Sequence, residues 1–304
     1  MTLTEMRYIL ALARERHFGR AAAACHVSQP TLSVAIKKVE TELGAALFER
    51  SSGELRITDL GEDVVEQVRR VIEEVVRLDE IASTGKDPLR GTLRIGVIYT
   101  VAPYLLPQLV PALHQRAPAM PLYIREDFTE RLLPALAGGQ LDAVILAMPI
   151  EQAGVVSKAL YAEPFRVLVP AEHPWRGQIA AAQLTPEQVM VLGQGNCFRD
   201  QVLEACPNLG LNTETGSAPG MEGGSLETLR HMVASGAGVA VMPSSAADPL
   251  EEREPLVRVL RFAEPAPCRQ IGIAWRVSFP RPAAIDAVRD GILACALPGC
   301  VRVK

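Results

Sequence analysis

The feature of this sequence that most constrains its fold is a stripe of apolar residues between positions 59 and 87. Spacings of four and three residues alternate along the stripe, which is typical of a coiled-coil helix. About 25 residues of helix make a rod roughly 37 Å long. No other segment up to Gly85 offers an apolar face that could cover the stripe, so we expect pairing with a second copy of the chain. The alternative is a helix packed on its own domain. The stripe consists of Val64, Val68, Val71, Val75 and Leu78, widened by Val65, Ile72 and Val76.

The residues before this stripe predict a small DNA-binding fold. Apolar residues recur at helical spacing over residues 4–16, and residues 19–25 form a helix of small side chains. After a tight turn, Ser28 is placed to cap a third helix that carries Pro30 in its first turn. This order predicts a helix-turn-helix, whose second helix enters the major groove of DNA. Residues 48–57 then predict two short strands around a glycine turn, which form a wing.

The exposed face of the third helix carries the candidate DNA contacts. Short polar side chains at its start can reach base edges, whereas hydroxyl groups, helix amides and lysines suit phosphates. Residues 1–58 hold eight Lys/Arg against six Glu, in a chain of net charge −4, so any DNA-binding surface is local. The alternative is a three-helix packing module with a solvated polar face. The candidate DNA-contacting residues are Ser28, Gln29, Pro30, Thr31, Ser33, Lys37 and Arg50, with Lys38 and Arg56 as further cations.

From Thr92 onward, short apolar strands alternate with helices. Such alternation predicts an α/β fold with mainly parallel sheets covered by helices, built as two units with a crevice between them. We expect the strands at 256–262 and 271–276 to return to the first unit. The other expected strands are 93–98, 122–125, 142–146, 165–169, 190–192, 239–242 and one near 213–217. The expected helices are 102–116, 129–138, one near 185–189, 225–235 and 282–296.

Two cysteines nine residues apart, Cys197 and Cys206, are candidates for a redox switch. On a helix they would be separated by a rise of about 13–14 Å, whereas a disulfide needs Cα atoms roughly 4.4–6.8 Å apart. A bond between them therefore requires the segment to unwind. Arg199 would favour the reactive thiolate, and Asp200 could orient or cancel that arginine. The alternative is that both are buried small hydrophobes without a redox role.

The whole cysteine set argues against a disulfide scaffold. Six cysteines in 304 residues, with no Cys-x-x-Cys, suit a reducing compartment, where cysteine bonds are transient or sensing. Their spacing does not match known zinc modules. We expect Cys25 to be a core residue and Cys268 a plain, partly buried thiol, and assign no role to Cys295 and Cys300.

Several motifs resemble the winged helix-turn-helix of LysR-type transcriptional regulators. They are Ala21-Ala22, Val27-Ser28-Gln29-Pro30-Thr31-Leu32-Ser33, Ile36-Lys37-Lys38-Val39-Glu40, Leu43-Gly44, Leu47-Phe48-Glu49-Arg50 and Thr58-Asp59-Leu60-Gly61. The resemblance implies a DNA-binding domain at 1–58, a linker and dimerisation helix at 59–87, and a periplasmic-binding-protein-like effector domain at 88–304. The effector domain would contain two α/β subdomains, 88–161 plus 268–304 and 162–267.

Within that family the chain resembles the OxyR subgroup, through Tyr104-Leu105-Leu106-Pro107, His173-Pro174-Trp175, Cys197-Phe198-Arg199-Asp200-Gln201 and Ser225-Leu226-Glu227-Thr228-Leu229-Arg230. The resemblance implies that Cys197 is the thiol that attacks peroxide and Cys206 the thiol that resolves the sulfenic acid. It also places Thr100, Thr129, Asp200 and Arg269 in the reactive pocket. One departure is Asn196, where the subgroup commonly has His, so the thiolate would depend more on arginines and helix amides.

The resemblance implies a regulator of the oxidative-stress response that senses hydrogen peroxide by reversible Cys197–Cys206 bonding. Its expected partners are promoter DNA, RNA polymerase, a thioredoxin- or glutaredoxin-type reductant, and further copies in a homodimer or homotetramer. We expect no cofactor, no metal and no enzymatic activity. With no signal peptide and no apolar run of about 18 residues, we expect a cytoplasmic protein without a membrane partner. The alternatives are a LysR regulator that answers a small metabolite, and a thiol peroxidase.

Overall fold

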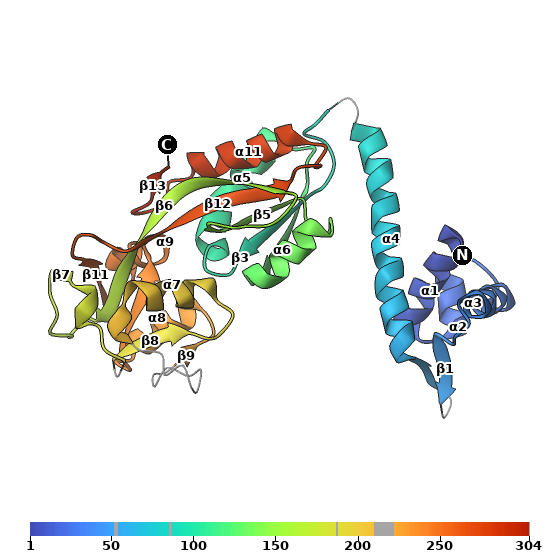
Figure 1. The fold of residues 1–304 in the computed structure, drawn as a ribbon, viewed down its shortest axis with the longest axis horizontal. Coiled ribbons are helices and arrows are strands. Elements are labelled where there is room, and N and C mark those ends of the chain that lie inside the picture. The colour runs from blue at the N-terminus through green and yellow to red at the C-terminus, as the bar shows by residue number, and fades with distance from the viewer. Residues whose placement is uncertain (52–53, 85–86, 187, 210–221, 304) are drawn as a thin grey trace. The chain divides into compact units, whose positions relative to one another are not determined.

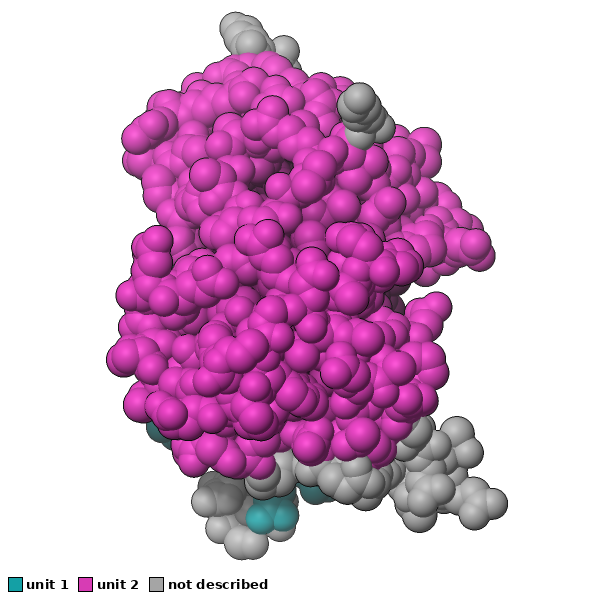
Figure 2. All heavy atoms as spheres, turned by 90° about the vertical axis from the view of Figure 1, so that its left-hand side faces the viewer, with its two compact units in different colours: residues 1–86 teal, residues 87–304 magenta. Residues whose placement is uncertain are grey.

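The computed structural model describes residues 1–51, 54–84, 87–186, 188–209 and 222–303. The chain divides into two compact units, residues 1–86 and residues 87–304, coloured teal and magenta in Figure 2. The strand expected near 213–217 lies outside the described residues.

The first unit contains the expected helix-turn-helix and wing. Its elements are α1 (Leu3–Glu15), α2 (Phe18–Ala24), α3 (Gln29–Leu43), β1 (Phe48–Ser51), β2 (Glu54–Ile57) and α4 (Asp59–Thr84). The Ser28 hydroxyl accepts a hydrogen bond from the Thr31 amide at 3.3 Å and so caps α3, while Gly44 ends this helix at a φ of 73° that favours glycine. Apolar side chains from all four helices form one core.

The apolar stripe on α4 is partly covered within its own unit. Val65 and Val68 are 7% and 3% exposed and belong to the core of the first unit, and Val64 packs against it. The expectation that no segment could cover the stripe is therefore wrong for its first part. Farther along α4, Leu78 is 65% exposed, so this part of the helix keeps an apolar side chain available to a partner.

The second unit has two lobes, each defined by its own hydrophobic core. The first lobe draws its core from residues 93–161 and 271–292. Its strands run in the order β4-β3-β5-β12-β6, in which β3, β4 and β5 are parallel and β12 is antiparallel to both neighbours. The elements are β3 (Leu93–Ile98), α5 (Ala102–Arg116), β4 (Leu122–Asp127), α6 (Thr129–Ala137), β5 (Ala143–Met148), β12 (Cys268–Arg276) and α11 (Pro282–Ala294).

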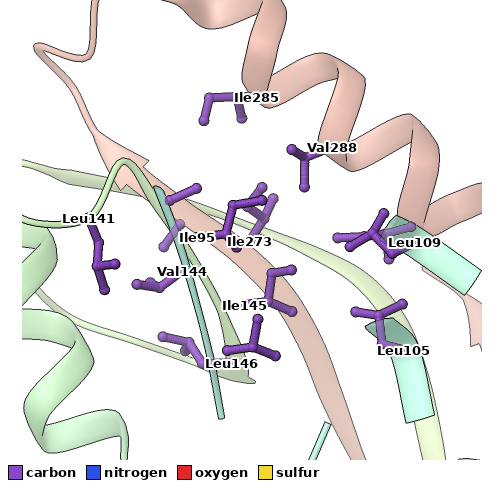
Figure 3. Close-up of a cluster of buried hydrophobic side chains, with 14 of the residues drawn as sticks. Ile95, Leu105, Leu109, Leu141, Val144, Ile145, Leu146, Ile273, Ile285 and Val288 are labelled. Carbon is purple, nitrogen blue, oxygen red and sulfur yellow. The ribbon is translucent and has the colours of Figure 1, made fainter. Parts of the chain in front are cut away.

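Helices cover both faces of the first-lobe sheet. Helices α5 and α11 lie side by side on one face, and α6 lies on the other (Figure 1). Leu105 and Leu109 of α5 and Val288 of α11 point toward Ile145 and Ile273 of the sheet (Figure 3). Burial of these side chains stabilises the lobe that carries one wall of the site described below.

The second lobe draws its core from residues 165–262. The long strand β6 (Val155–Pro170) runs through both lobes (Figure 1). Its first part pairs with β12 and its last part with β10 and β11. A subdomain boundary near residue 161 therefore falls inside a continuous strand. The remaining elements are β7 (Gln178–Ile179), η1 (Ala181–Gln183), β8 (Val189–Leu192), α7 (Cys197–Ala205), η2 (Pro207–Leu209), β9 (Glu222–Gly223), α8 (Leu226–Ala234), β10 (Val239–Pro243), α9 (Ser244–Ala247), α10 (Leu250–Arg253), β11 (Val257–Phe262) and β13 (Val301–Arg302).

Three expectations for this unit are wrong. Strand β11 pairs with β6 and β7 in the second lobe and does not return to the first. The helix expected near 185–189 is absent from the described residues of this segment, because Val189 already begins β8 and pairs with Val239. In addition, Pro186 disfavours a helical conformation of Thr185, the residue before it. The sheets are mixed, since β6 and β12 run antiparallel to their neighbours.

Candidate functional site

The turn before α7 determines where Cys197 lies. Gly195 has a φ of +87°, and a Cβ atom there would lie 3.8 Å from the Phe128 ring, so glycine suits the position. Asn196 follows as the N-cap, but its Nδ2 donates to the Gly193 carbonyl at 3.0 Å, and its side chain makes no capping bond to α7. Cys197 is therefore the first residue of a helix whose first-turn amides lack a side-chain cap. The positive end of a helix dipole favours a thiolate.

Cys197 lines a small cavity together with both expected threonines, Thr100 and Thr129. Residues 98–100, 127–129 and 195–197 line this cavity, which is partly open to solvent; its empty space of about 190 Å³ includes that open part. The Thr129 hydroxyl is buried and has no hydrogen-bond partner among the described residues. A buried hydroxyl without a partner is rare in proteins, and beside a cysteine thiol it suits a small polar ligand.

Arg269 fixes Thr100 from behind the cavity. Its Nη1 donates to Thr100 Oγ1 at 2.8 Å and its Nη2 to the Thr100 carbonyl at 3.0 Å. Its Nε donates at 2.7 Å to Glu163 Oε2, in an ion pair whose side chains are 1% and 0% exposed. The guanidinium carbon also lies 4.8 Å from the centre of the Phe198 ring. Arg269 therefore positions Thr100, and Glu163 balances its charge.

Glu163 was missed by the sequence reasoning. It is fully buried on β6 and accepts hydrogen bonds from both the backbone amide and the hydroxyl of Ser245. The available signal was an acidic residue within an otherwise largely apolar strand, because glutamate is almost never fully buried unless it is paired.

The other charged residues near Cys197 serve different purposes. Asp200 is exposed in the first turn of α7 and does not line the cavity. Arg199 is 4% exposed and donates at 2.6 Å to Glu222 Oε1 and at 2.8 Å to the Leu192 carbonyl. The charge of Arg199 is thus balanced by Glu222 and not by Asp200.

Asp127 brings a negative charge to the cavity wall. Burial alone would raise its pKa, but the hydrogen bond from Arg125 and the neighbouring Arg131 lower the pKa below its usual value. The Asp127 carboxylate lies 2.7 Å from the Arg125 guanidinium and 3.6 Å from that of Arg131. These two arginines offset the negative charge that Asp127 brings to the cavity wall.

Cys206 lies at the opposite end of α7 from Cys197. It is the C-cap residue, is 0% exposed within the core of the second lobe, and burial raises its pKa to about 11. Cys197 instead packs against the core of the first lobe. Both cysteines are free. The nine-residue helix gives a rise of about 13 Å between them, which is too far for a disulfide until α7 unwinds.

The remaining cysteines are not part of this pair. Cys268 is exposed, so the expectation of a partly buried thiol is wrong, whereas Cys25 packs against the core of the first unit as expected. Cys295 and Cys300 pack against the first-lobe core, and burial, followed by the nearby Glu163, raises the pKa of Cys300 to about 12. Within the described ranges no three His, Cys, Asp or Glu side chains are grouped to hold a metal ion.

The expected DNA-contacting residues lie at the start and on the outer face of α3. Gln29, Thr31 and Lys37 are exposed, as are Ser28 and Pro30, and Ser33 is half-buried. Lys38 is instead paired at 2.8 Å with Glu5 and at 3.6 Å with Glu42, and its hydrogen bond lowers the pKa of Glu5 to about 2. Arg50 lies in β1 opposite Leu55, and its side chain is outside the described part of the chain.

One residue of this face was missed. Val34 is 70% exposed on α3, three residues after Thr31. An exposed isopropyl group beside the candidate base-reading residues can contact a thymine methyl group.

Comparison with known proteins gives the class of protein. The family of LysR substrate binding domains matches residues 86–294, and the lysR family of bacterial regulatory helix-turn-helix proteins matches residues 3–62. The chain belongs to the LysR family of bacterial regulators. The expected fold class, a winged helix-turn-helix, a long helix and an α/β effector domain of the periplasmic-binding-protein type, is confirmed.

Several relatives that match nearly the whole chain are OxyR proteins. The chain is 40% identical over 296 residues to the transcriptional dual regulator OxyR of Escherichia coli K12, covering 97% of this chain and 95% of that protein. A full-length OxyR cysteine variant from Pseudomonas aeruginosa is 49% identical, with a TM-score of 0.72 over 100% of this chain and 98% of that one. A hydrogen-peroxide-bound cysteine variant of Corynebacterium glutamicum OxyR is 29% identical, with a TM-score of 0.64 over 96% and 91%. The chain therefore belongs to the OxyR group.

Of the helices that the structure describes, none is both long and apolar enough to cross a bilayer.

Proposed function

We propose that this chain is a transcription regulator of the oxidative-stress response that senses hydrogen peroxide at Cys197. The observation that carries the proposal is the buried Thr129 hydroxyl, which has no hydrogen-bond partner among the described residues, on a residue that lines the same cavity as Cys197 and Thr100. Two hydroxyl groups beside a thiol at a helix start can hold a peroxide by both of its oxygens. The arrangement suits a nucleophile and a bound small oxidant.

The chemistry proceeds in two steps. The Cys197 thiolate attacks one peroxide oxygen, the O–O bond breaks, and the leaving hydroxide takes a proton to become water, which leaves a sulfenic acid. The Cys206 thiol then loses its proton and its thiolate attacks the Cys197 sulfur; the S–O bond breaks, and the leaving hydroxide takes up a proton to become a second water, giving the disulfide. Thr100 and Thr129 orient the peroxide in the first step, while Arg269 holds Thr100 in place. Reduction by a thioredoxin- or glutaredoxin-type dithiol restores the two thiols.

The disulfide acts by rebuilding structure. Since the intact α7 keeps the two cysteines apart, the second step requires the helix to unwind and Cys206 to leave the core of the second lobe. Altered packing of this lobe would change how subunits of a homodimer or homotetramer meet, and with it the spacing of the α3 helices on promoter DNA. RNA polymerase would respond to that change, and the whole cycle takes place in the cytoplasm.

The experiment is thiol mapping by mass spectrometry after mild peroxide, with and without operator DNA. We expect a Cys197–Cys206 disulfide in the native chain and a sulfenic acid on Cys197 in Cys206→Ser. Cys197→Ser should lose peroxide-dependent transcription, whereas the matched control Cys268→Ser, at an exposed thiol, should keep it. A Cys197→Ser variant that still responds to an inducer would instead support a regulator that answers a small metabolite.

A further inference from the structure

Two aromatic rings form part of the cavity wall beside Cys197. Tyr99 and Phe128 meet edge to face, with ring centroids 5.1 Å apart and ring planes at 73°. Each ring directly precedes one of the two threonines, and both rings line the cavity. The two short segments that carry Thr100 and Thr129 therefore also carry the two rings.

The rings are held in place from several sides. The Phe128 backbone amide donates to Asp127 Oδ1 at 2.9 Å, and Asp127 is buried between two arginines. The Arg131 guanidinium carbon lies 5.7 Å from the centre of the Phe128 ring, and a Cβ atom at Gly195 would lie 3.8 Å from the same ring. Tyr99 is the more open ring, 42% exposed. The pair thus lies where solvent meets the cavity.

The space inside matches a very small molecule. The room available to the centre of a water-sized molecule is ≈ 10 Å³, which is about what a single such molecule requires. Hydrogen peroxide adds one oxygen atom to that size, but a hydroperoxide with a branched alkyl or aromatic group would have to displace a ring.

We infer that Tyr99 and Phe128 form an aromatic gate that sets the size of the oxidant that reaches Cys197. The gate admits hydrogen peroxide and excludes hydroperoxides that carry a bulky organic group. This inference rests on the proposed function, because it takes Cys197 as the thiol that attacks the peroxide. Rings that meet edge to face resist displacement, because their interaction adds to the stability that comes from burying their apolar surface.

The test compares two oxidants on the full-length chain. The rate constant for loss of the Cys197 thiol is measured with hydrogen peroxide and with cumene hydroperoxide, by alkylation and mass spectrometry of the peptide. In Phe128→Ala and Tyr99→Ala we expect the preference for hydrogen peroxide to fall by about tenfold or more, the scale at which pocket shape discriminates substrates. Tyr123→Ala is the matched control, because Tyr123 is 54% exposed and does not line the cavity.

The outcomes separate the gate from the proposed function. If hydrogen peroxide fails to oxidise Cys197 in the native chain, the proposed function is wrong. If hydrogen peroxide reacts normally but both ring variants keep the native preference, the gate is overturned and the sensing function stands. Circular dichroism and thermal unfolding establish which variants fold. Because Tyr99 is partly exposed, Tyr99→Ala provides a milder second variant should Phe128→Ala unfold.

Discussion

The helix α7 should control the second step of oxidation and leave the first unchanged. Glu204 is exposed on this helix near its Cys206 end and does not line the Cys197 cavity. Glycine at a helix position is about 0.5–1 kcal/mol less favourable than alanine. If Cys206 reacts only after α7 unwinds, the unwound fraction in Glu204→Gly exceeds that in Glu204→Ala by about two- to fivefold. Disulfide formation should then be faster in the glycine variant by the same factor.

The assay follows both steps in one time course. Each variant is mixed with excess hydrogen peroxide, quenched with an alkylating reagent and analysed by intact mass, which distinguishes free thiols, sulfenic acid and disulfide. We expect equal rates of Cys197 oxidation in the two variants, and a difference only in the conversion of sulfenic acid to disulfide. The comparison of Gly with Ala at one exposed position removes any effect of the lost carboxylate.

Equal rates of disulfide formation in the two variants would refute the reasoning. They would mean that the cysteines meet without unwinding α7, although the intact helix keeps them about 13 Å apart along its axis. A difference of the same size in the first step would also contradict it, because a perturbation near Cys206 would then be acting on the cavity at Cys197.

Four further results are expected. Thr129→Val should slow peroxide oxidation of Cys197 by about tenfold, the effect of losing one hydrogen bond, without lowering the melting temperature. Thr129→Ser keeps the hydroxyl and should keep the rate. An unchanged oxidation rate in the valine variant would count against the site. Glu163→Gln leaves Arg269 buried without its counter-charge, so the free energy of unfolding in urea should fall by about 3–5 kcal/mol. The control Glu172→Gln, at an exposed position, should change this free energy little. An equal loss of unfolding free energy in the two variants would contradict the prediction. Burial raises the pKa of Cys206 from 9.0 to about 11, so the buried neutral thiol stabilises the fold fully below pH 9, and this stabilisation is lost as pH rises toward 11. The difference in unfolding free energy between the native chain and Cys206→Ala should therefore shrink between pH 9 and pH 11. A difference that stays constant would argue against a buried thiol. Leu78→Glu on α4 should weaken self-association in sedimentation velocity by about tenfold or more, the loss of one buried leucine, and Glu62→Gln on the same helix should not; unchanged association would exclude Leu78 from the interface.

Sequence patterns predicted most elements of the fold because the signals are local. The strand at 93–98 and the helix at 102–116 match β3 and α5 residue for residue, and the Ser28 cap of α3 is present. The predictions were wrong where contacts between distant segments determine which strands pair and which helix faces are covered. Strand β11 pairs within the second lobe, and α1 covers the start of the α4 stripe; neither pairing is encoded by the periodicity of the segment itself.

The candidate site divides in the same way. Resemblance named Thr100, Thr129, Cys197 and Arg269, which the fold brings to one cavity and its supporting network. Glu163 could not be linked to Arg269 from sequence, because the two are 106 positions apart and meet only through the pairing of β6 with β12. The outward position of Asp200 follows from the rotation of α7, which a motif alone does not reveal.

Residues between the two cysteines connect α7 to other parts of the effector domain, so the proposed Cys197–Cys206 disulfide would change contacts outside this helix. Phe198 is 1% exposed and packs against Phe165 with ring centroids 5.0 Å apart, and its ring also contacts the Arg269 guanidinium that fixes Thr100. If α7 unwinds from its first turn to bring Cys206 to Cys197, Phe198 moves with it, which removes a support of the cavity beside Cys197. The Arg199–Glu222 pair, which ties α7 to β9, must separate as well. If the proposed disulfide forms in this way, it also removes supports of the cavity, and we expect the oxidised chain to react with no further peroxide until Cys197 is reduced.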